Sequence, residues 1–150
     1  MADLKDLYQE ILLDHYRRPR NRHKLEQSNR QADGINPLCG DKLSVYLQVE
    51  NGTIRKISFD GTGCAISIAS ASMMTESLQG KTEEEARTIL ARFLQLLTAG
   101  SATPSGTDTL GDLSTFSGVR EYPVRVKCAT LAWHTFRAAL EHSPERVSTE

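Results

Sequence analysis

The residues in this 150-residue chain with the most chemical potential are three cysteines and one aspartate. Cys39, Gly40 and Asp41 are consecutive, and in an extended segment the side chains at i and i+2 point the same way. The Cys39 thiolate and the Asp41 carboxylate could therefore approach one ion, while Gly40 lets the backbone bend around it. Taken alone, the pair is more typical of a buried cysteine followed by a turn aspartate.

The other two cysteines are each predicted to lie at or near a helix start. Cys64 follows the glycine-rich stretch 61–63, between a predicted strand and a predicted helix. Free N–H groups and partial positive charge at a helix N-terminus favour the thiolate form of cysteine. Cys128 lies three residues after Arg125 in the last predicted helix, so the two share a helix face. Arg125 could hold an anionic site closed there, although a core cysteine beside a solvated basic turn is the simpler interpretation.

Together these residues supply three thiolates and one carboxylate. Zinc favours four such ligands in a tetrahedron, and soft thiolates also bind iron–sulfur clusters, so the spacing leaves both open. No Cys-x-x-Cys pair is present, which excludes a zinc ribbon or a thioredoxin-type redox motif. An odd number of cysteines, with no export signal at the N-terminus, argues against a disulfide framework.

The elements that must position these residues follow from hydrophobic periodicity. Alternating residues predict strands over 43–50 and 53–60, and Asn51-Gly52 between them is typical of a type I′ hairpin turn. The polar stretch 20–37 predicts a loop with at most one short strand, near 28–33. Helices are expected over residues 3–16, 65–79, 82–100, 110–116 and from Pro123 to about His142.

This order of elements predicts an α+β fold. We expect a small antiparallel sheet of about three strands with helices packed on one face, in a single domain spanning residues 1–150. Thr82 and Glu85 form a capping box at the start of the third helix. Residues 99–109 are rich in Gly, Ser, Thr and Pro and predict a loop, and residues 143–150 predict a frayed polar tail.

Composition excludes several classes of function. The formal net charge is −1, so no broad attraction to nucleic acid or to a membrane surface is expected. No apolar run approaches the roughly 20 residues that span a bilayer. Residues 1–10 alternate acidic and basic side chains and lack the apolar core of a signal peptide, so we expect a cytoplasmic location.

Three longer stretches, residues 11–21, 36–41 and 59–72, resemble the U-type iron–sulfur cluster assembly proteins, which comprise the IscU scaffolds and the SufU proteins. Lys127 stands immediately before the third cysteine, where IscU scaffolds carry histidine. Residues 99–118 resemble the insertion that SufU proteins carry, and Pro123-Val124 departs from the scaffolds' longer chaperone-recognition motif. The chain therefore resembles the SufU branch.

The resemblance implies a zinc-dependent sulfurtransferase in iron–sulfur cluster biogenesis. Zinc would be bound by Cys39, Asp41, Cys64 and Cys128. The protein would accept persulfide sulfur from a SufS-type cysteine desulfurase, activate that enzyme, and pass sulfur to downstream iron–sulfur assembly or sulfur-accepting proteins. Cys39 would be a ligand at rest and the sulfur acceptor after docking, and helix spacing suggests that Arg125 steadies the site.

Two alternatives stay open. One is an IscU-like scaffold on which a transient [2Fe-2S] cluster is assembled, and the other is a binding module whose zinc is purely structural. Structural zinc sites usually have all-Cys or Cys/His ligands, so Asp41 argues mildly against the second. We expect a monomer or weak dimer.

Overall fold

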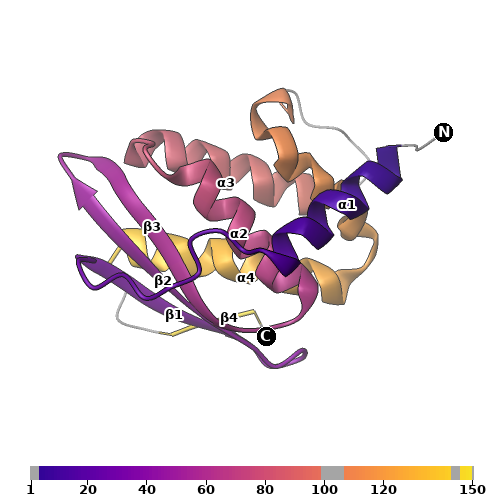
Figure 1. Ribbon diagram of the computed structural model, residues 1–150, viewed down its shortest axis with the longest axis horizontal. Helices are drawn as coiled ribbons and strands as arrows, with labels where there is room; N and C mark the ends of the chain where they lie inside the picture. The colour runs from indigo at the N-terminus through magenta and orange to yellow at the C-terminus, as the bar shows by residue number, and fades with distance from the viewer. Residues whose placement is uncertain (1–3, 99–106, 143–145, 150) are drawn as a thin grey trace.

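A computed structural model describes residues 4–98, 107–142 and 146–149 of the chain (Figure 1). The elements in chain order are α1 (Leu4–Arg17), β1 (Arg30–Asn36), β2 (Asp41–Glu50), β3 (Thr53–Thr62), α2 (Ala65–Leu78), α3 (Glu83–Thr98), the 3₁₀ helix η1 (Thr107–Glu121), α4 (Pro123–Leu140) and β4 (Val147–Ser148). The predicted α+β class is confirmed, with the helices gathered on one side of the sheet (Figure 1).

The β2–β3 hairpin forms where alternation predicts it. Asn51 and Gly52 have φ angles of 52° and 76°, as a type I′ turn requires. Leu43, Val45 and Leu47 are buried on the face of β2 that the helices cover. The long hairpin gives the sheet a rigid base, and its open end carries Asp41 at the first position of β2.

The sheet has four strands in the order β3-β2-β1-β4, rather than about three. The additional strand, β4, pairs in parallel with β1 through Gly34 and Ile35, so the sheet is mixed rather than wholly antiparallel. Val147 packs its apolar side chain against the core, and the Thr149 N–H donates to the Ile35 carbonyl at 3.2 Å. These contacts explain why residues 147–148 form a strand where we expected a frayed tail.

Strand β1 extends three residues beyond the predicted end at residue 33. Its buried positions are Ala32, Gly34 and Asn36, which are small or polar and so lack the apolar alternation of an ordinary strand. A Cβ at Gly34 would lie 2.1 Å from the Thr135 Oγ1, so α4 packs directly against the backbone of β1. The strand ends with Asn36 paired across from Asp41.

The helices pack in the pattern that positions the functional residues. Helix α4 lies across β1 and β2, α2 packs on β3 and α4, and α1 packs on α2. Thr82 and Glu85 form the predicted capping box, because each backbone N–H donates to the other's side chain, at 3.0 and 3.1 Å. His15 at the end of α1 is 4% exposed, and its Nδ1 lies 2.8 Å from the Ser72 Oγ of α2.

The described part of the predicted 99–118 insertion is helical. It begins at Thr107, within the predicted loop, and continues as η1 beyond the predicted helix 110–116, while residues 99–106 lie outside the described residues. Leu113, Phe116 and Val119 are buried at a spacing of three, which matches the three residues per turn of a 3₁₀ helix. Phe116 contacts Phe93 edge-on, and Phe93 stacks on Trp133. Among the described residues, no helix has the length and apolar character needed to cross a membrane.

Candidate metal centre

Cys39, Asp41 and Cys128 converge at the end of the sheet where β1 turns into β2. Cys39 lies in the turn between these strands, Asp41 begins β2, and Cys128 projects from α4. One ligand atom from each residue lies within 4.8 Å of the others, and the Cys39 and Cys128 Sγ atoms are 3.2 Å apart. Residues separated by 89 positions in the sequence are thus brought together at one point.

Cys64 joins this group from the start of α2. It is the N-cap residue of that helix, but its thiol makes no capping hydrogen bond. Its backbone N–H instead donates to the Asp41 Oδ1 at 2.9 Å. Its thiol also lies near enough to Cys128 to influence the pKa of that residue. Cys64 therefore lies near Asp41 and Cys128, whereas the ligand atoms that all lie within 4.8 Å of one another are those of Cys39, Asp41 and Cys128.

The four side chains differ in exposure. Asp41 is fully buried, Cys128 is 2% exposed, Cys64 is half-buried and Cys39 is exposed. Burial raises the pKa of the Cys128 thiol far above its usual value, and the hydrogen bond with Cys39 and the charges of Cys64 and Asp41 raise it further. Ionised thiols at these positions would repel one another and Asp41, so the thiolate form needs a cation at their centre.

Two glycines allow α2 to begin close to β2. Gly61 has a φ of 133°, and a Cβ there would lie 2.0 Å from the Lys42 carbonyl oxygen. A Cβ at Gly63 would lie 2.9 Å from the Asp41 Oδ1. Because Gly63 has no side chain, the Asp41 carboxylate can lie beside the Cys64 N–H. Both glycines therefore let the backbone approach its neighbours more closely than a residue with a side chain could.

Asn36 also lies at this site, although its residue type and position in the sequence did not indicate a role there. It is fully buried, and its Nδ2 lies 3.2 Å from the Asp41 Oδ2 and 3.4 Å from the Cys128 Sγ. Its backbone carbonyl also accepts a hydrogen bond from the Cys39 N–H at 3.3 Å. Asn36 could have been identified from its pairing with Asp41 across the turn. That pairing follows only if β1 is predicted to extend to residue 36.

The donor set suits a thiophilic divalent metal. A zinc–sulfur bond of about 2.3 Å places two tetrahedral thiolates about 3.8 Å apart, close to the 3.2 Å between Cys39 and Cys128. The clustered residues supply two sulfur donors and one carboxylate, with no histidine among them, and the nearby Cys64 would supply the third sulfur of a four-coordinate site. Zinc therefore fits these residues, and the soft thiolates also suit iron in a cluster.

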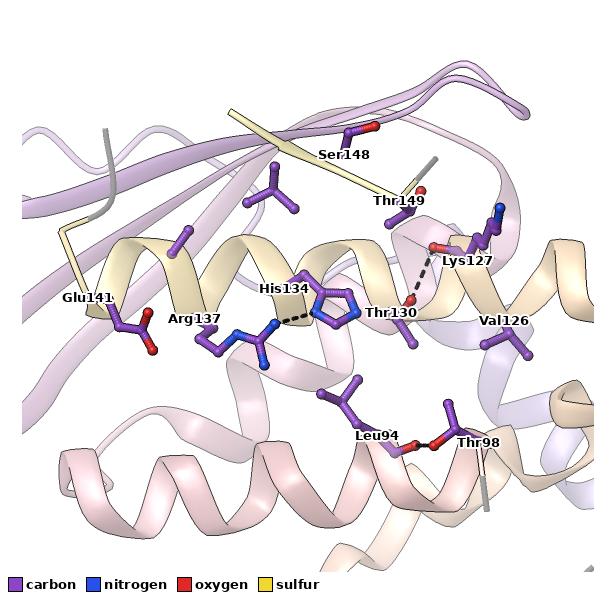
Figure 2. Close-up of a pocket in the computed structure, with 12 residues that line it drawn as sticks. Leu94, Thr98, Val126, Lys127, Thr130, His134, Arg137, Glu141, Ser148 and Thr149 are labelled. Atoms are coloured by element: carbon purple, nitrogen blue, oxygen red, sulfur yellow. Dashed lines mark hydrogen bonds between the residues drawn. The ribbon is translucent and has the colours of Figure 1, made fainter. Parts of the chain in front are cut away.

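Arg125 and Lys127 lie on the same helix as Cys128 but have other surroundings. Arg125 is exposed, and its guanidinium carbon lies 4.8 Å from the ring centroid of Tyr122. Lys127 lines a cavity of about 720 Å³ between α3, α4 and β4 (Figure 2). None of the residues lining this cavity is a cysteine, and its polar contacts include the 3.1 Å approach of Arg137 Nη2 to His134 Nδ1 (Figure 2).

Comparison with known proteins gives consistent matches over most of the chain. The family model described as the NifU-like N-terminal domain matches residues 7–129. The zinc-dependent sulfurtransferase SufU of Bacillus subtilis is 39% identical over 132 residues, covering 88% of this chain and 88% of that protein. The iron–sulfur cluster assembly scaffold protein IscU of Streptococcus pyogenes is 35% identical, covering 95% of this chain and 88% of that protein.

A solved structure agrees with these relatives. The crystal structure of FiSufU from the thermophile Fervidobacterium islandicum superposes with a TM-score of 0.82 at 32% identity, covering 92% of this chain and 99% of that one. The similarity therefore extends to the fold. The resemblance on which the sequence analysis relied is confirmed, and the chain belongs to the NifU-like N-terminal domain family.

Proposed function

We propose that this protein is a zinc-dependent persulfide acceptor in iron–sulfur cluster assembly, working with a cysteine desulfurase of the SufS type and activating it. The observation that carries the proposal is the exposure of Cys39 in a cluster whose other donors are buried or half-buried. A relative at 39% identity is named a zinc-dependent sulfurtransferase, and others are named iron–sulfur cluster assembly scaffolds.

The residues that would hold zinc are Cys39, Asp41, Cys64 and Cys128. When bound, zinc supplies the positive charge that keeps these crowded thiols in the thiolate form. The chain itself supplies the orientation, because the Cys64 N–H and the Asn36 amide each donate to one oxygen of Asp41. Arg125, one turn before Cys128, stays a proposed steadying residue with a weaker basis, since its guanidinium lies against Tyr122.

The proposed transfer step is an exchange at sulfur. The Cys39 thiolate attacks the terminal sulfur of the persulfide on the desulfurase cysteine. A new S–S bond forms on Cys39 while the S–S bond of the donor breaks, and its electron pair leaves with the desulfurase cysteine as a thiolate. The terminal sulfur carries its charge or proton with it, so the step needs no external oxidant or reductant.

Three large apolar side chains are exposed on the segments that carry Cys39 and Cys128. Leu38, Tyr122 and Val124 are 60%, 50% and 53% exposed. Leu38 precedes Cys39, and the other two lie at the start of the helix that carries Cys128. Exposed apolar residues beside a reactive thiol suit docking of a protein partner that presents its own cysteine. This supports a desulfurase as the sulfur donor and a further sulfur-accepting protein as the recipient.

The test is turnover of a SufS-type desulfurase with and without this protein. We expect the wild type to raise turnover, Cys39→Ala to return it to the rate of the desulfurase alone, and mass spectrometry to find one added sulfur atom on Cys39. Lys42→Ala, at an exposed neighbour of the site, is the control and should activate like the wild type. Full activation by Cys39→Ala would overturn Cys39 as the acceptor.

A second candidate function is a scaffold for cluster assembly. It is favoured by the IscU relatives, which match 95% and 91% of the chain. Metal analysis and visible absorption of the purified protein separate the two. A colourless protein with about one zinc per chain supports the transferase, because the site offers four donors. A brown protein that passes an intact cluster to an apo-acceptor supports the scaffold. Zinc with no effect on desulfurase turnover would instead indicate a structural site.

A further inference from the structure

Asn36 contacts three of the four residues proposed as ligands, and does so in two different ways. Its side-chain Nδ2 reaches the Asp41 Oδ2 and the Cys128 Sγ, whereas only its backbone carbonyl reaches Cys39. We propose that Asn36 is a positioning residue that fixes Asp41 and Cys128 as a preassembled pair and leaves the thiol of Cys39 free to move. The inference rests on the metal site of the proposed function.

The chemistry of an amide suits this role. An ionised carboxylate and a thiolate only accept hydrogen bonds, and the amide NH₂ has two hydrogens to donate, one for each. Because Asn36 is fully buried, water cannot replace either bond. Hydrogen bonds to ionised groups are stronger than neutral ones, so the two bonds orient the carboxylate and the thiolate toward the same point.

The position of Asn36 in the fold makes the orientation rigid. It is the last residue of β1 and is paired with Asp41 across the sheet, so both residues are held by the ladder. The side chain of Asn36 points toward α4, where it contacts the buried Cys128. The side chain thus connects the end of a strand with a helix that is distant in the sequence.

Cys39 is held differently. It is exposed in the four-residue turn, its one described contact with Asn36 is made by its backbone N–H, and Gly40 after it has a φ of 71°. The Cys39 side chain can therefore rotate without disturbing the bonds of Asn36 to Asp41 and Cys128. This division lets one thiol react with a partner while the rest of the donor set stays in place.

The test compares zinc affinity and cobalt spectra of the wild type, Asn36→Ala and a matched control. Zinc affinity is measured by competition with a chelator, and cobalt is used because its visible spectrum reports tetrahedral geometry. We expect Asn36→Ala to weaken zinc binding about 10- to 100-fold, as loss of an outer hydrogen bond typically does, and to alter the cobalt spectrum.

The control is Asn29→Ala, which removes another asparagine amide. Asn29 makes two hydrogen bonds to the backbone of Val49, at the opposite end of the same strand pair. It should lower the unfolding temperature while leaving zinc affinity and the cobalt spectrum unchanged, which separates positioning from general stability. If Asn36→Ala does not fold, Asn36→Ser is used as the test variant instead. Its hydroxyl can replace one of the two hydrogen bonds, so its zinc affinity should be intermediate.

The outcomes also separate this inference from the proposed function. The role of Asn36 alone would be overturned if folded Asn36→Ala had the zinc affinity and cobalt spectrum of the wild type. If only Asn36→Ser folds, the same result in that variant would overturn it. A wild type that binds no zinc would overturn both proposals. Zinc binding that depends on Asn36, in a protein that never affects desulfurase turnover, would support the positioning role and reject the transferase.

Discussion

Cys39, Cys64 and Cys128 carry the same functional group, but their surroundings divide their roles. Cys128 is buried beside Asn36, and Cys64 begins a helix with its N–H bonded to Asp41. Of the three cysteines only Cys39 is exposed, and it lies in a turn in which Gly40 follows it. A buried thiol serves well as a permanent ligand, whereas an exposed one can meet a partner, so exposure rather than residue type distinguishes the proposed acceptor, Cys39.

Gly63 gives a test of how closely the site is packed. A Cβ there would lie 2.9 Å from the Asp41 Oδ1 and 3.1 Å from the Ser67 Cβ. We expect Gly63→Ala to displace the carboxylate, to weaken zinc binding, and to lower the free energy of unfolding by about 1–3 kcal/mol, as overpacking does. Chelator competition and denaturant unfolding measure the two effects.

The matched control for this substitution is Gly118→Ala in η1. A Cβ at Gly118 meets nothing within 4 Å, so the same chemical change should leave zinc affinity as in the wild type. Equal zinc affinity in the Gly63 and Gly118 variants would show that Asp41 does not depend on the missing side chain at residue 63.

At the scale of single residues, the sequence indicated the candidate donors but not the residue that supports them. The three cysteines and Asp41 indicate a metal site only when they are considered together, and the family resemblance named Cys39 as the acceptor. Asn36 stands before a proline, where asparagine ordinarily indicates a turn. Its burial depends on strand pairing and on the approach of α4, which are contacts between segments far apart in the sequence.

At the scale of elements, the structures that depend on residues close in the sequence were predicted correctly, and those that depend on distant contacts were not. The hairpin and the capping box depend on residues within a few positions of each other, and both formed as predicted. Strand β4 has two residues and exists only because β1 offers a free edge. The 3₁₀ form of η1 depends on its packing against α3, which the sequence pattern over 110–116 did not indicate.

Helix α4 carries a titratable group whose behaviour tests its packing. Burial lowers the pKa of His134 below its usual 6.5, and the neighbouring Arg137 lowers it further. Above about pH 6.5 the imidazole is neutral in both states, so its contribution to stability is fully present. As the pH falls through 6.5 the unfolded chain takes up the proton first, and the folded state loses stability until the folded pKa is reached.

We therefore expect the free energy of unfolding to fall less steeply in His134→Gln than in the wild type on acidification below about pH 6.5. Urea titrations at several pH values measure this slope. His23→Gln, at an exposed histidine, is the control and should keep the wild-type slope. Identical slopes for the wild type and His134→Gln would contradict a half-buried imidazole that stays neutral in the cavity of Figure 2.

At the scale of the whole molecule, the candidate metal centre joins parts of the chain that otherwise meet only through the core. The β1–β2 turn supplies Cys39 and Asp41, the start of α2 supplies Cys64, and α4 supplies Cys128. An ion bound to all of them would connect the sheet to two helices at a single point. Opening any one of these elements would then require breaking the site, so binding should be coupled to global unfolding.

This coupling predicts that zinc raises the unfolding temperature of the protein. An ion that binds only the folded state adds about 4 kcal/mol of stability when its free concentration is about 1,000 times its dissociation constant. Calorimetry with zinc and with a chelator measures the shift, which should be reversible. Cys128→Ala removes the buried donor and should lose most of the shift. The same shift in both proteins would mean that zinc binds elsewhere, because a site centred on Cys128 cannot be insensitive to its removal.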